Sequence, residues 1–253
     1  MIAERIRILI IIMFPVFLMP QSSYIDSLFI KANQEYSAQN FASASNMYHH
    51  IMNQGYGHAD LFYNMGNAYY HLAQLGDAIW AYEKGLQLNP RDGDLRFNLK
   101  VANARMIDRV EAPDSFVLLD MYRSIKYGFS SRQWLDLIGI LVLISGLLFI
   151  VSKYVMISFE KILRKITWTL LGIALVSLLV FFDQYYELSK REEAIVVSNK
   201  VDVYSAPTNL SSLVFVMHEG TKLKVTNNQP PWIEVELIDG KKGWVTTELI
   251  REL

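Results

Sequence analysis

Two apolar stretches without interior charges place the strongest limit on what this sequence can form. One runs from Trp134 to Val151, with a single charge, Asp136, near its start, and the other runs from Ile166 to Phe182. Each is about 17 or 18 residues long, at the short end of the length that a membrane-spanning helix needs. Hydrophobic residues make up 52% of the chain, more than most soluble domains contain. We therefore predict transmembrane helices over 134–152 and 166–183, because the other segments offer too little apolar surface to enclose such a pair.

The residues around these stretches indicate how they are oriented. The segment 153–165 between them carries one acid, Glu160, and four basic residues, Lys153, Lys161, Arg164 and Lys165. By the positive-inside rule this segment is a cytoplasmic basic loop, which leaves both flanking parts of the chain outside. Ser130 and Gln133 have the spacing of a capping box and mark the start of the first helix.

The amino-terminal segment 1–23 agrees with that orientation. Arg5 and Arg7 precede about a dozen mostly apolar residues, Ile8 to Met19, which are followed by polar ones. That length is too short for a spanning helix and typical of a signal peptide. We expect an export signal or, because the cleavage site is poor, an uncleaved amino-terminal anchor.

An internal repeat fills the segment 24–110. Sliding the sequence against itself by 34 residues, the period of tetratricopeptide repeats, superposes Asn33 on Asn67, Tyr36 on Tyr70, Ala44 on Ala78 and Tyr48 on Tyr82. The second copy, 59–92, resembles the tetratricopeptide pattern closely in Phe62, Met65, Gly66, Tyr69, Ala78, Tyr82 and Pro90. The first copy, 25–56, is more degenerate, and the helical pattern over 94–109 predicts the capping helix that a stacked array needs. Gly85 stands where the family usually has alanine, which predicts looser packing there.

The resemblance places four asparagines, Asn33, Asn64, Asn67 and Asn98, on the concave face of the array. Asparagine offers both a donor and an acceptor to an extended peptide, so these residues are the candidate partner-binding groove. The alternative, that they are solvated or helix-stabilising polar residues, stays open. Binding of a carboxyl terminus, known for one groove subtype, is not expected, because Phe29, Phe97 and Val101 stand where that subtype has basic residues.

The segment 111–133 links the repeats to the membrane. Glu111-Ala112-Pro113 ends the helical array, and Phe116, Leu119, Tyr122, Ile125 and Phe129 then recur at three- and four-residue steps. This spacing predicts a juxtamembrane amphipathic helix on the bilayer surface. A final helix packed on the repeats is an equally good interpretation.

After the second apolar stretch the pattern changes to short alternating strands, predicted over 194–197, 213–217, 222–226, 232–237 and 243–245. The segments Asp202 to Pro207, His218 to Thr221, Trp232 to Val235 and Asp239 to Val245 resemble a bacterial SH3-like domain, spanning 184–253. That resemblance implies a ligand such as a peptidoglycan stem or a peptide. Tyr204 and Trp232 are the candidate ligand-binding aromatics, although Trp232 could instead belong to the core, and the domain could dock without a ligand.

No residues point to catalysis or to a cofactor. The chain has no cysteine, it contains no phosphate-binding glycine loop, and its five histidines lack metal-ligand spacing. The net charge of −1 gives no basic surplus for nucleic acid. We therefore expect a protein that is not an enzyme, with no metal, no cofactor and no nucleic-acid partner.

The order of these parts is similar to the BatE family of bacterial Bat (aerotolerance) operons over nearly the full length. The residues Tyr63 to Tyr70, Ser130 to Trp134 and Glu193 to Val196 carry the likeness. It implies a multidomain membrane protein with an α-helical tetratricopeptide solenoid, a transmembrane helical hairpin and a small all-β SH3-like barrel. It also implies a scaffold in the bacterial inner membrane, with both modules in the periplasm. The implied partners are membrane proteins with von Willebrand factor A domains and, indirectly, a MoxR-type ATPase. Peptidoglycan binding through the SH3-like domain is the alternative function.

Overall fold

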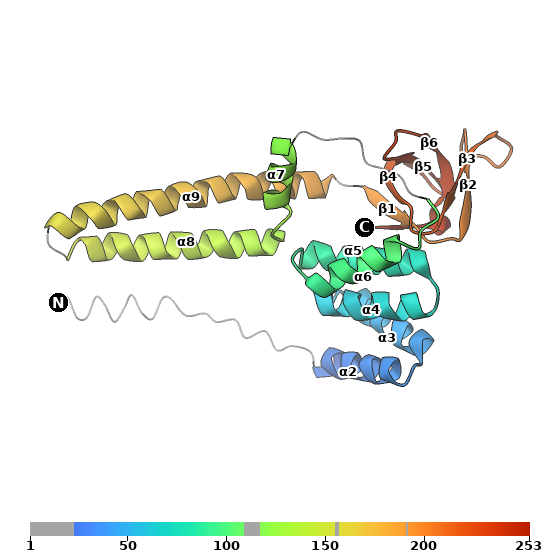
Figure 1. Cartoon of the computed structure of the whole chain (residues 1–253), viewed down its shortest axis with the longest axis horizontal. Helices are drawn as coiled ribbons and strands as arrows, with labels where there is room; N and C mark the ends of the chain where they lie inside the picture. Colours follow the sequence, from blue (N-terminus) through green and yellow to red (C-terminus); the bar gives the residue numbers. More distant parts are fainter. Residues whose placement is uncertain (1–22, 109–116, 155–156, 191) are drawn as a thin grey trace.

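The computed structural model describes residues 23–108, 117–154, 157–190 and 192–253. A helical module and a β-sheet lie together at one end of the molecule, and two long helices extend side by side from them to the other end (Figure 1). The predicted export signal or anchor lies outside the described residues, except for Ser23. The same holds for the part of the predicted linker that runs from Glu111 to Phe116.

The amino-terminal part is helical, as predicted. Its helices are α2 (Ser23–Ser37), α3 (Phe41–Asn53), α4 (Ala59–His71), α5 (Leu75–Leu88) and α6 (Gly93–Asn103). Consecutive helices pack on each other, and the stack runs from α2 at one end to α5 beside the sheet (Figure 1). Tyr48, Met65 and Tyr82 are among the largest fully buried side chains at the centre of this stack. Asp92 caps the start of α6, because its carboxylate accepts hydrogen bonds from the backbone amides of Asp94 and Leu95. The helix ends at Asn103, short of the predicted limit of 109.

Two glycines allow these helices to approach closely. A Cβ atom added to Gly66 would lie no farther than 3.0 Å from ring atoms of Tyr82. At Gly85 an added Cβ would lie 2.9 Å from both methyl groups of Leu95. The expectation of looser packing at Gly85 was therefore wrong, because the leucine of the following helix fills the space that an alanine would take.

The two apolar stretches form α8 (Ser131–Ser152) and α9 (Ile157–Ser189), and both are long and apolar enough to span a membrane. The capping box at the start of α8 is confirmed. The backbone N–H of Gln133 donates to Ser130 Oγ, and the backbone N–H of Ser130 donates to Gln133 Oε1. Small polar residues, Ser145, Ser152, Thr167 and Ser177, are buried, while large apolar side chains point outward. The apolar outer surface suits lipid, where no water competes.

The loop between the two long helices is shorter than the predicted 153–165. Helix α9 begins at Ile157, so Lys161, Arg164 and Lys165 lie on its first turns and only the segment 153–156 separates the two helices. The residues 157–165 can be helical because they include no glycine or proline. The side chains of Glu160 and Arg164 also form an ion pair at 3.7 Å across one helical turn. At its other end α9 continues to Ser189, beyond the predicted limits of 166–183.

The amphipathic helix α7 (Val117–Lys126) packs against α9. Lys126, only 3% exposed, donates through Nζ to the carboxylates of Asp183 and Glu187. Burial would lower the pKa of the Lys126 ammonium, but these two hydrogen bonds outweigh it and raise the pKa above its ordinary value. The charged lysine therefore holds α7 at the end of the long helices, and Val117, Leu118 and Met121 remain exposed.

The carboxyl-terminal part is an antiparallel sheet. Its strands are β1 (Glu193–Val196), β2 (Lys200–Tyr204), β3 (Leu213–His218), β4 (Lys222–Gln229), β5 (Trp232–Leu237), β6 (Lys242–Thr246) and β7 (Ile250–Glu252), in the order β3-β2-β6-β5-β4-β1-β7. A short 3-10 helix, η1 (Thr247–Leu249), precedes β7. The five predicted strands are present with small shifts in their ends. Strands β2 and β7 were not predicted. The end of β2 overlaps a segment with the residues of a turn, and β7 is only three residues long.

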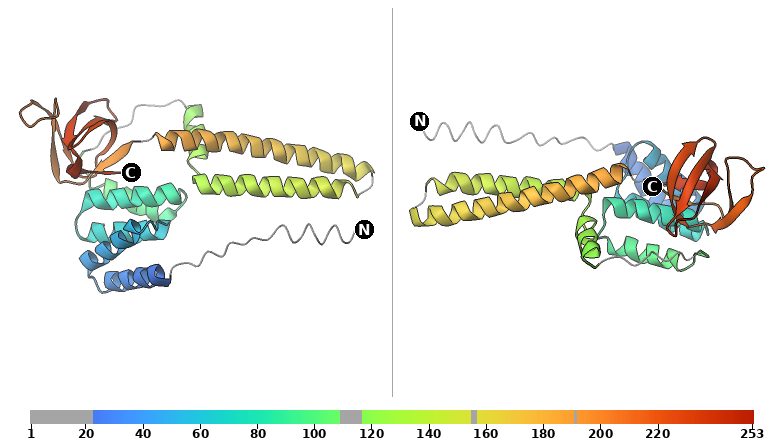
Figure 2. Two further views of the ribbon diagram at one scale, coloured as in Figure 1. Left: turned by 180° about the vertical axis from the view of Figure 1, so that it is seen from behind. Right: turned by 90° about the horizontal axis from the view of Figure 1, so that it is seen from above.

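Strand β1 belongs to two hydrophobic cores. Ala194 and Val196 point into the core of the sheet, whereas Ile195 is fully buried in the core of the helical module. Successive side chains of a strand point to opposite faces, so this strand is covered on both. The helical module and the sheet, which lie before and after the long helices in the sequence, are thereby packed together (Figure 2).

Candidate functional site

The four predicted groove asparagines are brought together in two equivalent units. Oδ1 of Asn33 accepts hydrogen bonds from Tyr48 Oη at 2.7 Å and from Asn64 Nδ2 at 3.1 Å. Oδ1 of Asn67 accepts from Tyr82 Oη at 2.8 Å and from Asn98 Nδ2 at 2.7 Å. Every partner in the second unit follows its counterpart by the repeat offset. These asparagines therefore join neighbouring helices, whatever contact they also make with a partner.

Tyrosine hydroxyls surround these units. Burial raises the pKa of Tyr82, and the nearby Tyr36, Tyr63 and Tyr70 raise it further. The Arg105 guanidinium lies 4.5 Å from the centre of the Tyr70 ring. The Tyr82 hydroxyl therefore stays neutral, and the exposed Phe97 lies next to Asn98 in the sequence.

The two aromatic residues predicted in the last domain line one cavity of about 290 Å³. Tyr204 pairs with Trp244 of β6, and Trp232 pairs with Thr246 two residues further along the same strand. Strand β6 thus holds the two rings on one face, with centroids 5.9 Å apart and planes at 89°. Trp232 is half-buried at this cavity and lies outside the core of the sheet. On β6 the core residue is Val245, the neighbour of Trp244.

Charged groups complete the wall of the aromatic cavity. Lys200, Asp202 and Glu248 line it. Oδ1 of Asp202 is buried and receives no hydrogen bond from the described residues, and the nearest ion-pair partner, Lys200 Nζ, lies 3.7 Å away. The Asp202 side chain as a whole is 44% exposed, so the rest of its carboxylate is an acceptor within reach of a ligand amide or amine.

A third surface, which sequence reasoning missed, is the contact between α5 and the sheet. Glu219 accepts hydrogen bonds from the amides of Leu75 at 3.0 Å and Gly76 at 3.2 Å. Its carboxylate caps the first turn of α5, where Gln74 provides no side-chain cap. The Trp80 indole donates to the carbonyl oxygen of Glu252 at 2.7 Å.

An ion pair strengthens the same contact. Arg251 lies 2.7 Å from Asp77 and places its guanidinium 4.5 Å from the centre of the Trp80 ring. Burial raises the pKa of the Asp77 carboxyl, and Arg251 opposes that effect. One feature of the sequence indicates this docking. A strand with one face in water alternates apolar and polar residues, whereas Ala194 to Val197 are all apolar, as expected for a strand that is covered on both faces.

Comparison with known proteins assigns the last part of the chain. The bacterial SH3 domain family matches residues 199–251, which include β2 to β6 and most of β7. Strand β1, through which the sheet contacts the helices, lies outside the matched residues. No curated protein matches the chain. The chain thus combines a helical part, two helices able to span a membrane and a bacterial SH3 domain, a kind of domain that suggests binding of protein or peptidoglycan.

Proposed function

We propose that this chain is a membrane-anchored scaffold whose helical module and SH3-like domain act as one rigid binding unit. The observation that carries the proposal is the docking of α5 on the sheet through Ile195, Glu219, Trp80 and Arg251. The two modules flank a helical hairpin in the sequence, so their contact requires both to lie on the same side of the bilayer. A fixed arrangement of two binding modules favours a role in assembly.

The finer assignments rest on the sequence resemblance. We propose that the helical module is a tetratricopeptide solenoid, which the repeated Asn-Tyr hydrogen bonds support. We further propose that the protein is an accessory subunit of a Bat-type complex linked to aerobic stress tolerance. Its partners would be membrane proteins with von Willebrand factor A domains and, indirectly, a MoxR-type ATPase. The modules would face the periplasm.

Cysteine labelling tests the orientation, because the chain contains no native cysteine. We expect Asn46→Cys on α3 and Asn228→Cys on β4, both at exposed positions, to react with a membrane-impermeant maleimide on cells with a permeable outer membrane. Lys161→Cys, exposed near the start of α9, should react only after the inner membrane is opened. Equal labelling of positions 46 and 161 in closed cells would contradict the proposed topology.

Photo-cross-linking tests the scaffold. A photoreactive residue in place of Phe97, which is 66% exposed beside Asn98, should give a discrete adduct with a membrane protein that contains a von Willebrand factor A domain. Asn46, exposed on the outer helix α3, is the matched control position and should give no such adduct. If both positions give the same adducts, or neither gives any, the face beside Asn98 is not the contact surface.

The aromatic cavity favours a second candidate function, the binding of peptidoglycan. The crossed rings of Tyr204 and Trp232 would hold the apolar part of a stem peptide, and the partly exposed Asp202 carboxylate would accept a hydrogen bond from an amide or amine. We expect the full chain in detergent to co-sediment with purified cell-wall sacculi. Tyr204→Ala and Trp232→Ala should each weaken that binding about tenfold or more. Tyr24→Ala, at an exposed tyrosine of α2, should leave it unchanged.

The full chain is the appropriate sample for this experiment. An isolated sheet would expose Ile195, which is buried among the helices, and could adsorb to sacculi through that apolar side chain. Co-sedimentation that is equal for all three variants would show non-specific adsorption and would remove the cavity as the binding site.

A further inference from the structure

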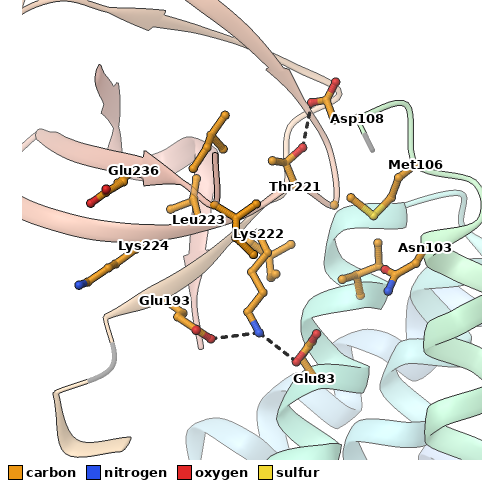
Figure 3. A pocket seen from close by; sticks show the side chains of 15 residues that line it. Glu83, Asn103, Met106, Asp108, Glu193, Thr221, Lys222, Leu223, Lys224 and Glu236 are labelled. Atoms are coloured by element: carbon orange, nitrogen blue, oxygen red, sulfur yellow. Dashed lines mark hydrogen bonds and ion pairs between the residues drawn. The ribbon is translucent and has the colours of Figure 1, made fainter. Parts of the chain in front are cut away.

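Ion pairs and a closed core join the helical module to the SH3-like domain. Figure 3 shows Lys222 of β4 between two carboxylates, with Glu193 of β1 at 3.0 Å and Glu83 of α5 at 3.3 Å. Ile79 and Ile195 beside this cluster are at most 2% exposed. These contacts fix the two modules to each other. The attachment of this pair of modules to the long helices lies elsewhere, around α7.

A polar cluster holds α7 at the end of the long helices. Tyr122 Oη donates to Asp183 at 2.6 Å. Lys126 donates to the carboxylates of both Asp183 and Glu187. The buried Gln184 side chain donates to the carbonyl oxygen of Lys126 at 2.9 Å. Because Asp183 is the first residue after the apolar run of α9, α7 lies at the level where the apolar surface of α9 ends.

The side chains of α7 form three stripes along the helix. Residues four apart lie on the same side, since each residue is turned by about 100° from the one before it. Tyr122 and Lys126 form the stripe that contacts α9. About a third of a turn to one side lies an apolar stripe, whose members are 56 to 70% exposed: Val117, Met121 and Ile125. About a third of a turn to the other side lies an exposed polar stripe: Asp120 and Arg123.

Helix α7 also has a distinct direction. In Figures 1 and 2, α8 and α9 run along the long axis of the molecule, and α7 lies across that axis. A helix that crosses a membrane-spanning hairpin in this way lies parallel to the membrane surface. The exposed side chains of Leu135 on α8 and Phe182 on α9 lie at the same end of the hairpin, so the apolar stripe of α7 continues the apolar surface of the long helices.

We propose that α7 is an interfacial helix whose apolar stripe enters the bilayer leaflet on the side of the modules. The proposal rests on the proposed membrane anchoring by α8 and α9. The occupant of the stripe is lipid, because a helix held at the edge of the apolar span and parallel to the surface has acyl chains along one flank. Val117, Met121 and Ile125 lose contact with water there, while Asp120 and Arg123 face the solvent.

This placement would set the height of the modules above the membrane. The Arg91 guanidinium, which follows α5, lies 3.8 Å from the centre of the Phe129 ring. Phe129 belongs to the short segment between α7 and α8, where the Trp134 indole also donates to the carbonyl oxygen of Lys126 at 3.2 Å. The helical module therefore contacts the same segment that α7 fixes, and lipid that holds α7 also holds the module near the surface.

Quenching of fluorescence by lipid tests the placement, because the chain contains no native cysteine. The full-length variants Met121→Cys, Arg123→Cys, Val142→Cys and Asn46→Cys are each labelled with a nitrobenzoxadiazole dye and reconstituted into phosphatidylcholine vesicles. One set of vesicles contains phosphatidylcholine with a nitroxide near the top of its acyl chain. A second set carries the nitroxide near the end of the chain.

The upper nitroxide should quench position 121 about twofold more than position 123, since an interfacial helix buries its apolar face by about 5 to 10 Å. Position 142, in the middle of α8, should be quenched by the lower nitroxide, and position 46 on α3 by neither. Absence of quenching at 142 would show that the hairpin does not span and would remove the proposed anchor itself. Quenching at 142 without stronger quenching at 121 than at 123 would overturn the interfacial helix alone.

A charge placed on the apolar stripe gives a second test. Met121→Glu, measured with the dye on Val117→Cys, should reduce quenching by the upper nitroxide about twofold, because a carboxylate is costly to remove from water. Arg123→Glu puts the same group on the polar stripe of the same helix and is the matched control. It should leave quenching at position 117 unchanged. An equal reduction by both substitutions, or by neither, would contradict insertion of the apolar stripe.

Discussion

Gly76→Ala is expected to separate the helical module from the SH3-like domain. The added Cβ would lie 2.8 Å from the Cα of Val197 and closer still to the carbonyl oxygen of Val196. Both are backbone atoms that cannot rotate away, so the two modules must move apart. That movement breaks the hydrogen bonds from the backbone amides of Leu75 and Gly76 to Glu219. It also exposes part of the Ile195 side chain to water. We expect a cost of about 3 kcal/mol, about a hundredfold in the docking equilibrium.

Hydrogen exchange with mass spectrometry measures this effect. Peptides that cover 72–80 and 248–253 should lose protection in Gly76→Ala, while the interior of α3 and the core of the sheet keep theirs. Gly93→Ala is the matched control, because nothing lies within 4 Å of a Cβ added there and alanine favours a helix over glycine by about 1 kcal/mol. Unchanged exchange at 72–80 in Gly76→Ala would mean that the modules do not meet at Gly76.

The local elements were predictable because their signals lie within short stretches of sequence. The apolar runs predict α8 and α9, and the Ser130-Gln133 pair predicts where α8 begins. The limits of α9 were not predictable from hydropathy alone, since its polar turns at Lys161 and Glu187 are still helical. A basic segment beside an apolar one can be a loop or a helix end, and hydropathy does not distinguish them.

Contacts between distant parts of the chain were harder to foresee. The offset of 34 residues aligned Asn33 with Asn67 and Tyr48 with Tyr82, but nothing in the spacing shows that the hydroxyl of each tyrosine reaches the asparagine on another helix. Likewise Glu219 lies 144 residues from Leu75, and only the fold brings it to the start of α5. Tyr204 and Trp232 were selected as aromatics in SH3-like segments, and strand β6 is what places them together.

Asn67→Leu is expected to destabilise the helical module strongly. The substitution removes the acceptor for the Tyr82 hydroxyl, in a side chain that is 1% exposed, and for the Asn98 amide. An unsatisfied buried polar group costs about 1 to 3 kcal/mol, so the loss should reach about 2 to 4 kcal/mol in denaturant unfolding followed by helical circular dichroism. Asn46→Leu, exposed on α3, should change the free energy of unfolding by less than about 0.5 kcal/mol.

The double variant distinguishes a hydrogen-bonding role from a change of shape. Tyr82→Phe removes the donor, and with both partners apolar no buried hydroxyl is left without an acceptor. If the hydrogen bond is what matters, Asn67→Leu should cost about 1 to 2 kcal/mol less in the Tyr82→Phe background. A coupling of zero would assign the loss to packing. Because Asn67 supports the fold in either case, a partner lost on changing Asn67 does not identify a contact residue, and the exposed Phe97 is the sharper probe of that face.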